Sequence, residues 1–81
     1  MLKYAKIVRD ILEEVIMYEE FEDDTDLIKE EILDSLTIVY LVGQLEERLH
    51  IIIDEKLVVP ENFNSIQTIS KLLDEVGKGS L

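Results

Sequence analysis

Residues 31–36, Glu31-Ile32-Leu33-Asp34-Ser35-Leu36, run directly into a segment with helical periodicity that extends to Leu49. An apolar lead-in followed by Asp-Ser is typical of the start of a helix, so we expect an amphipathic helix over 35–49. The hydroxyl of Ser35 should then be exposed at the helix N-terminus. One side of this helix is apolar and forms its core face: Ile38, Leu41, Val42, Leu45 and Leu49.

The same spacing predicts a long helix before this one and another after it. The first is expected over about 2–18, with a core face made by Tyr4, Val8, Ile11, Leu12 and Val15. The last is expected over about 65–76, because Asn64-x-x-Gln67 resembles a capping box and Gly77 provides a stop. Its core face is made by Ile66, Ile69, Leu73 and Val76.

The segment between the second and last helices has a weaker periodic signal. We expect the isoleucine-rich run 51–53 to be a buried connection, and residues 56–59 to form a short turn of helix that Pro60 interrupts. Residues 77–81 should be a frayed tail. The predicted fold class is all-α: a small four-helix bundle with three longer helices and one short third helix, in a single domain over 1–81.

The composition limits the classes of function. Nineteen acidic and eight basic residues give a formal net charge of −11, which disfavours nucleic acid and anionic lipid and favours basic protein partners. The chain has no cysteine, so any thiol chemistry must come from an added group. The apolar runs are far shorter than the ~18 residues of a membrane span, and no secretion signal follows Met1. We therefore expect a cytoplasmic protein, acting as a monomer.

An acidic run, Glu22-Asp23-Asp24-Thr25-Asp26, invites comparison with a calcium-binding loop. Counting Glu22 as position one places Leu27 where such a loop needs glycine and Leu33 where it needs a bidentate glutamate. We therefore expect a solvated acidic loop and no metal site.

Three chemical roles are open to Ser35. A nucleophilic serine needs a base within hydrogen-bond reach, but the single histidine, His50, is about 22 Å away if one helix spans both. The hydrolase interpretation therefore fails, and no catalytic residue is expected. Ser35 can instead receive a phosphate-linked group from another enzyme, since a helix N-terminus holds phosphate well. It can also be only the N-cap of the helix, which uses the same geometry.

A second apolar stripe lies nearly opposite the core face of the 35–49 helix. It comprises Leu36, Tyr40, Gly43 and Glu47, flanked by Val39 and Glu46. Folding does not require this stripe. It begins beside Ser35 and ends in two carboxylates, an arrangement that suits a protein docking surface with an apolar centre and a charged rim. The alternative is a set of scattered surface apolar residues, which are common.

These features together resemble the acyl carrier proteins and the related peptidyl and aminoacyl carrier proteins over roughly 4–76. The resemblance rests on Ile32-Leu33-Asp34-Ser35-Leu36 after an acidic loop, on Leu45-Glu46-Glu47-Arg48-Leu49 closing the next helix, and on Glu61-Asn62-Phe63-Asn64-Ser65-Ile66 opening the last. Asp34-Ser35-Leu36 is the specific motif among them.

The resemblance implies a function and a set of partners. In that family the serine, here Ser35, carries 4′-phosphopantetheine from coenzyme A, and the terminal thiol holds an acyl or aminoacyl group as a thioester. Asp34 and Leu36 would help a phosphopantetheinyl transferase to recognise the site, and Glu46 and Glu47 match acidic positions that meet basic patches on partner enzymes. The chain would be a carrier and not an enzyme. Its other partners would be an acyl or aminoacyl ligase or acyltransferase, and downstream acyl-transfer enzymes.

Three positions depart from the fatty-acid type of carrier. Thr37 and Tyr40 stand where acids are usual, and Glu31 stands where a glycine is frequent. These differences favour a specialised, free-standing carrier that works with an adenylating ligase in peptide, polyketide or D-alanyl transfer. A competing hypothesis of a different class is an acidic helical adaptor for a basic protein partner, with Ser35 as a cap and no prosthetic group.

Overall fold

The computed structural model describes residues 3–17 and 19–77. In this part of the chain three α-helices and two short 3-10 helices follow one another: α1 (Ala5–Val15), α2 (Ser35–Leu49), η1 (Glu55–Leu57), η2 (Pro60–Asn62) and α3 (Ile66–Gly77). These residues contain no strand, so the prediction of an all-α fold is confirmed. Within the described ranges, no helix has the length and apolar character needed to cross a membrane.

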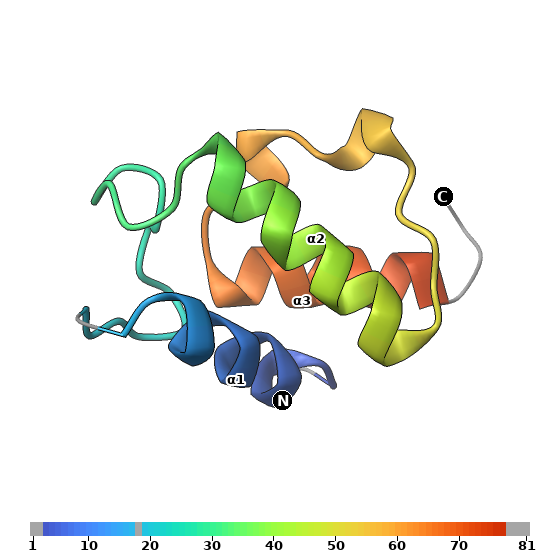
Figure 1. The fold of residues 1–81 in the computed structure, drawn as a ribbon, viewed down its shortest axis with the longest axis horizontal. Coiled ribbons are helices and arrows are strands. Elements are labelled where there is room, and N and C mark those ends of the chain that lie inside the picture. Colours follow the sequence, from blue (N-terminus) through green and yellow to red (C-terminus); the bar gives the residue numbers. More distant parts are fainter. Residues whose placement is uncertain (1–2, 18, 78–81) are drawn as a thin grey trace.

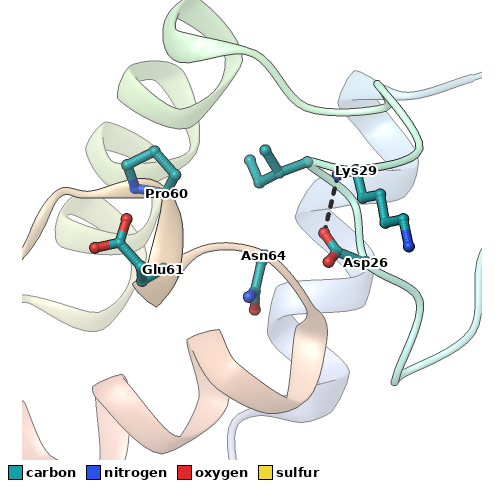
Figure 2. Close-up of a pocket in the computed structure, with 6 residues that line it drawn as sticks. Asp26, Lys29, Pro60, Glu61 and Asn64 are labelled. Carbon is teal, nitrogen blue, oxygen red and sulfur yellow. Dashed lines mark hydrogen bonds between the residues drawn. The ribbon is translucent and has the colours of Figure 1, made fainter.

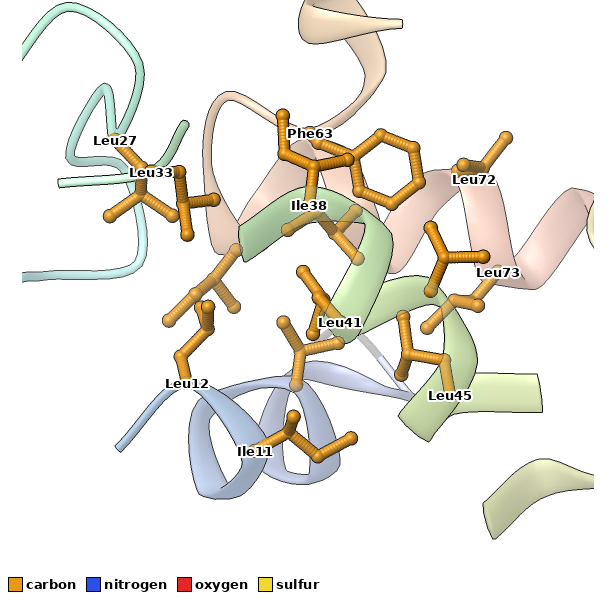
Figure 3. Close-up of a cluster of buried hydrophobic side chains, with 14 of the residues drawn as sticks. Ile11, Leu12, Leu27, Leu33, Ile38, Leu41, Leu45, Phe63, Leu72 and Leu73 are labelled. Atoms are coloured by element: carbon orange, nitrogen blue, oxygen red, sulfur yellow. The ribbon is translucent and has the colours of Figure 1, made fainter. Parts of the chain in front are cut away.

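The three α-helices enclose a common hydrophobic core. Figure 1 shows α2 crossing in front of α3, with α1 below them in this view. α1 contacts both α2 and α3, and η2 contacts α3. Figure 3 shows side chains from all three helices in this core together with Phe63, which is fully buried. The core residues predicted from the periodicity that are buried here are Val8, Ile11, Leu12, Ile38, Leu41, Val42, Leu45, Ile66, Ile69 and Leu73.

The helix bounds agree with the sequence for α2 and differ for α1. α2 spans the predicted 35–49. α1 begins at Ala5 and ends at Val15, where the Ile16 N–H donates to the Leu12 carbonyl at 2.7 Å. The predicted ends, Leu2 and Tyr18, lie outside the described residues. No glycine or proline follows Val15 closely, so the sequence carries no clear stop signal at the observed end.

The predicted short third helix over 56–59 is not confirmed, and neither is the four-helix bundle. A single 3-10 turn, η1, occupies this place, and a second turn, η2, begins at Pro60. Asp54 starts η1 by accepting a hydrogen bond from the Lys56 N–H at 2.9 Å. Proline is suited to the first position of a helical turn, where a backbone N–H would have no partner within the turn. Pro60 therefore opens a turn instead of only interrupting one.

The isoleucine-rich connection is buried on one side only. Ile53 is 5% exposed, but Ile52 is 86% exposed, so the prediction of a buried connection is wrong for Ile52. Where the backbone is extended, successive side chains point to opposite sides, and the burial of Ile53 beside the exposed Ile52 fits such a pattern.

The cap of α3 also differs from the prediction. Ser65 Oγ accepts a hydrogen bond from the Thr68 N–H at 3.1 Å, so Ser65 and not Asn64 caps the helix. The Asn64 carbonyl instead accepts from the Leu27 N–H at 2.6 Å, which ties the start of α3 to the loop before α2. α3 spans Ile66–Gly77, so it begins and ends one residue later than the predicted 65–76, and Gly77, which was predicted to stop the helix and open the frayed tail, is its last residue. The rest of the predicted frayed tail, 78–81, lies outside the described residues.

Candidate functional site

A compact loop over 27–33 positions the start of α2. The Leu27 carbonyl accepts hydrogen bonds from the N–H groups of Ile32 at 2.8 Å and Leu33 at 2.9 Å. Leu27 and Leu33 are both buried, so the two ends of the loop are fixed in the core. Glu31 turns the chain with a φ of 60°, in the left-handed region that glycine adopts without strain. By the resemblance described above, Glu31 stands where carrier proteins frequently have glycine, and its left-handed backbone is the conformation that glycine adopts most easily.

Asp34, and not Ser35, is the N-cap of α2. Its backbone is extended, and its Oδ1 accepts hydrogen bonds from the backbone N–H and the hydroxyl of Thr37, both at 2.9 Å. The hydrogen bond from the Thr37 N–H is the main cause of a lowered pKa for Asp34, so this carboxyl is ionised at neutral pH. The interpretation of Ser35 as the cap is therefore wrong.

Ser35 is the first residue of α2, and its side chain is exposed, as predicted. Its hydroxyl has no hydrogen-bond partner among the described residues. Of the other serines in the chain, Ser65 is engaged with Thr68 and is 8% exposed, and Ser70 is 1% exposed. Ser80 lies outside the described residues. Within the described part of the chain, Ser35 is therefore the serine that an enzyme can reach.

His50 cannot act as a base for Ser35. It is the C-cap of α2, with a left-handed backbone (φ 55°, ψ 47°), and Ser35 is at the opposite end of the same helix. At a rise of about 1.5 Å per residue, the helix separates the two residues by roughly 22 Å.

The outer face of α2 is apolar next to Ser35. Leu36 is 82% exposed, Val39 63% and Tyr40 54%. Gly43 lies further along the same face, and, apart from its two chain neighbours and the backbone of its own helix, no atom of the described residues lies within 4 Å of the place where a Cβ would stand. Of the predicted stripe and its two flanking residues, all but Glu46 are exposed. We call these five residues the α2 stripe: Leu36, Val39, Tyr40, Gly43 and Glu47. Its use for docking remains a prediction.

The two acidic residues near the end of α2 have different surroundings. Glu46 is half-buried, and its Oε2 accepts a hydrogen bond from the Ile53 N–H at 2.8 Å, which holds the connection against the helix. Glu47 is exposed and forms no ion pair with any described residue. Arg48, the single basic residue of α2, bonds Glu14 of α1 through both carboxylate oxygens, at 2.9 and 3.0 Å. Glu47 is therefore the free carboxylate of the pair.

Arg9 had no predicted role, yet it fastens the acidic loop to α1. Its guanidinium donates to the Phe21 carbonyl at 3.2 Å and to Asp23 Oδ1 at 2.7 Å, and lies 5.1 Å from the centre of the Phe21 ring. The hydrogen bond with Asp23 raises the pKa of Arg9. Opposite charge was the only sequence signal for this pairing, and charged residues are too frequent in this chain for that signal to select one pair.

A shallow hollow of about 230 Å³ lies between the loop before α2 and η2 (Figure 2). It is lined by Asp26, Ile28, Lys29, Pro60, Glu61 and Asn64. The sequence did not predict it, because its walls come from two segments far apart in the chain. Ser35 does not line it, and Asp26 Oδ1 is already bonded to the Lys29 N–H at 2.9 Å. The hollow is therefore not part of the candidate attachment site.

A family model described as the phosphopantetheine attachment site matches residues 6–76. No curated protein and no solved structure matches the chain. The matched region includes α1 almost entirely, all of α2 and most of α3. Proteins of this family attach 4′-phosphopantetheine covalently. The chain therefore belongs to the phosphopantetheine attachment family, as its resemblance to acyl and peptidyl carrier proteins predicted.

Proposed function

We propose that residues 1–81 form a single carrier domain that holds an acyl or aminoacyl group on a 4′-phosphopantetheine arm attached to Ser35. The main support is the exposed hydroxyl of Ser35, which has no partner among the described residues because Asp34 supplies the helix cap. A serine that capped the helix would lose that role when modified. Ser35 has no such role to lose, so the hydroxyl is free for modification.

The start of α2 fits a phosphodiester. Ser35 lies at the positive end of the α2 dipole, where backbone N–H groups favour a negative charge. Ser35 and its neighbour Leu36 are both exposed, so the fold leaves the hydroxyl accessible from solvent. The bound group would supply the thiol that this cysteine-free chain lacks, and that thiol would hold the acyl or aminoacyl group as a thioester.

The α2 stripe is the proposed docking surface for the enzymes that act on this arm. These are a phosphopantetheinyl transferase, which Asp34 and Leu36 would help to position, then an acyl or aminoacyl ligase or acyltransferase, and downstream acyl-transfer enzymes. The net charge of −11 and the free carboxylate of Glu47 favour basic surfaces on these partners. Because salt screens such steering, the rate of encounter should fall as the salt concentration rises.

The proposed carrier performs no catalysis of its own. His50, the single histidine of the chain, lies at the far end of α2 from Ser35 and cannot serve it as a base. The thioester chemistry therefore belongs to the partner enzymes, and we propose that the chain meets them in the cytoplasm as a monomer.

The competing adaptor hypothesis explains less of this arrangement. It assigns Ser35 to the helix cap, a role that Asp34 performs. It also leaves the position of an exposed serine at one end of the α2 stripe without a reason. An adaptor would use the α2 stripe to bind a basic partner, but Ser35 could then be replaced without loss.

Intact-mass measurement tests the proposal. The purified chain and its Ser35→Ala variant are incubated with coenzyme A, magnesium and a broad-specificity phosphopantetheinyl transferase. We expect the parent to gain one phosphopantetheine and the variant to gain none. If the parent gains no mass with several such transferases, or if the variant gains as much as the parent, the proposal is wrong.

A further inference from the structure

The hollow between the loop before α2 and η2 lies close to Ser35, although Ser35 does not line it. The Leu27 carbonyl accepts a hydrogen bond from the Leu33 N–H at 2.9 Å, which brings the two ends of the loop together. Leu33 is two residues before Ser35, a span of at most about 7 Å. Ile28, which directly follows Leu27, lines the hollow. The backbone at this wall is therefore within roughly 15 Å of the backbone at Ser35.

An arm attached to Ser35 is long enough to enter the hollow. Between the serine oxygen and the sulfur, 4′-phosphopantetheine has about fourteen bonds, as many as about five residues of extended backbone, or roughly 16 Å. The hollow is shallow, so the end of the arm reaches it from solvent and no helix has to move. A group held on the sulfur can therefore lie in the hollow.

The walls of the hollow combine apolar surface with oxygen atoms that can accept hydrogen bonds. Ile28 and Pro60 supply the apolar surface, and Asn64 supplies an amide. Asp26 accepts a hydrogen bond from the Lys29 N–H through its Oδ1, at 2.9 Å, which leaves its Oδ2 for a ligand. A group with a small apolar part and a hydrogen-bond donor would match these walls.

The charge of the hollow favours a cationic donor. Asp26 and Glu61 are exposed carboxylates that line it, and neither forms an ion pair with a described residue. Lys29 also lines it, but Figure 2 shows the amino group of this lysine pointing away from Glu61 and Asn64. An ammonium group would therefore be attracted to the hollow, and a second carboxylate on the ligand would be repelled.

We propose that this hollow binds the group carried on the arm, and that this group is a small aminoacyl group. The inference rests on the function proposed above. The ammonium of the aminoacyl group would meet the Asp26 carboxylate, and its side chain would pack against Ile28 and Pro60. The volume of about 230 Å³ equals that of about eight water molecules, and a small aminoacyl group has fewer non-hydrogen atoms than that. A long acyl chain would leave most of its apolar surface in water.

The test loads Ser35 with two analogues of coenzyme A in which an amide replaces the labile thioester. One analogue carries an alanyl group, and the other carries an isobutyryl group, which has the same shape with a methyl in place of the amine. A broad-specificity phosphopantetheinyl transferase attaches each arm, and intact mass verifies the loading. Backbone N–H chemical shifts of the isotope-labelled chain then show which residues the carried group contacts.

Two variants separate the charge of the hollow from the charge of the chain. Asp26→Asn removes a carboxylate of the hollow but keeps an oxygen acceptor for the Lys29 N–H. Glu55→Gln removes an exposed carboxylate of η1 that does not line the hollow, and it is the matched control. Titration of the alanyl amine by the same spectra gives a second readout.

We expect the alanyl arm to shift the N–H signals of Ile28, Lys29 and Asn64 more than the isobutyryl arm does. The pKa of the alanyl amine should be about half a unit higher on the chain than on the free analogue, because the exposed carboxylates stabilise its charged form. Both effects should disappear in Asp26→Asn and remain in Glu55→Gln.

Three results would overturn the inference: equal shifts with the two arms, no shift at the hollow with either arm, or effects that persist in Asp26→Asn. A loaded chain with any of these results leaves the carrier function intact and refutes only the binding of an aminoacyl group in the hollow. If the parent gains no mass from either analogue or from coenzyme A, the proposed function has failed, and this inference fails with it.

Discussion

Replacing Ser35 with alanine should leave the fold at least as stable as that of the parent chain. The hydroxyl removed has no hydrogen-bond partner among the described residues and faces solvent. Alanine is a better helix former than serine by about 0.5 kcal/mol, so the free energy of unfolding should rise by between zero and this amount. If Ser35 were the cap of α2, the same change would instead lower stability by about 1 kcal/mol. The two interpretations therefore predict changes of opposite sign.

Urea and thermal unfolding, followed by the helical circular dichroism signal, distinguish these outcomes. Asp34→Ala is the matched control, because it removes the acceptor of both hydrogen bonds from Thr37 and should lower stability. A melting temperature for Ser35→Ala about 4–8 °C below that of the parent would refute the assignment of the cap to Asp34.

The contribution of Asp34 should also depend on pH. Its pKa in the folded chain is below the ordinary value of 3.8, mainly because the Thr37 N–H bonds the ionised carboxylate. A carboxyl whose pKa is lowered on folding stabilises the folded state at every pH above its pKa in the unfolded chain. This stabilisation is lost as the pH falls through the pKa of the folded chain. The stability difference between the parent and Asp34→Ala should therefore be constant near neutral pH and shrink below pH 3.8. A difference that persists under more acidic conditions would contradict this cause.

Three further predictions concern stability and are checked by denaturant unfolding. Ile53→Ala should lower the free energy of unfolding by about 2–5 kcal/mol because Ile53 is buried, whereas Ile52→Ala at the exposed neighbour should change it by less than about 0.5 kcal/mol. Equal losses would show that the connection is buried on both sides. Glu46→Ala should cost about 1–2 kcal/mol by leaving the Ile53 N–H without its acceptor, and Glu47→Ala should be nearly neutral. The reverse order would exclude the structural role of Glu46. Glu31→Gly should raise stability by up to about 1 kcal/mol, since it relieves a left-handed backbone at the expense of chain entropy. A loss would mean that the Glu31 side chain itself holds the turn.

The sequence predicted helices most accurately where a local signal marks their ends. α2 has an Asp-Ser pair at its start and regular apolar spacing up to Leu49, and its bounds agree with the prediction. The observed end of α1 at Val15 has no glycine or proline close behind it, so the predicted helix was too long. At the start of α2, aspartate and serine are about equally good caps. Which of the two adjacent residues leaves the helical backbone conformation depends on the path of the loop, and the sequence does not show that path.

The exposure of the outer face of α2 was predicted better than the contacts that surround it. Helical spacing alone placed Leu36, Tyr40 and Gly43 on a face opposite the core, and the first two are exposed there. The same spacing treated Glu46 and Glu47 alike. Their difference arises because the connection after α2 folds back and brings the Ile53 N–H to Glu46. Such contacts between a helix and a non-helical segment have no periodic signal, so only the folded chain reveals them.

Mapping the modified residue decides most directly whether this chain is a carrier loaded at the start of α2. After incubation with coenzyme A, magnesium and the transferase, the loaded chain is digested and its peptides are fragmented in a mass spectrometer. We predict phosphopantetheine on Ser35, within the peptide that contains Asp34-Ser35-Leu36, and none on Ser65, Ser70 or Ser80. Phosphopantetheine on any other residue, or no modified peptide at all, would contradict the proposed function.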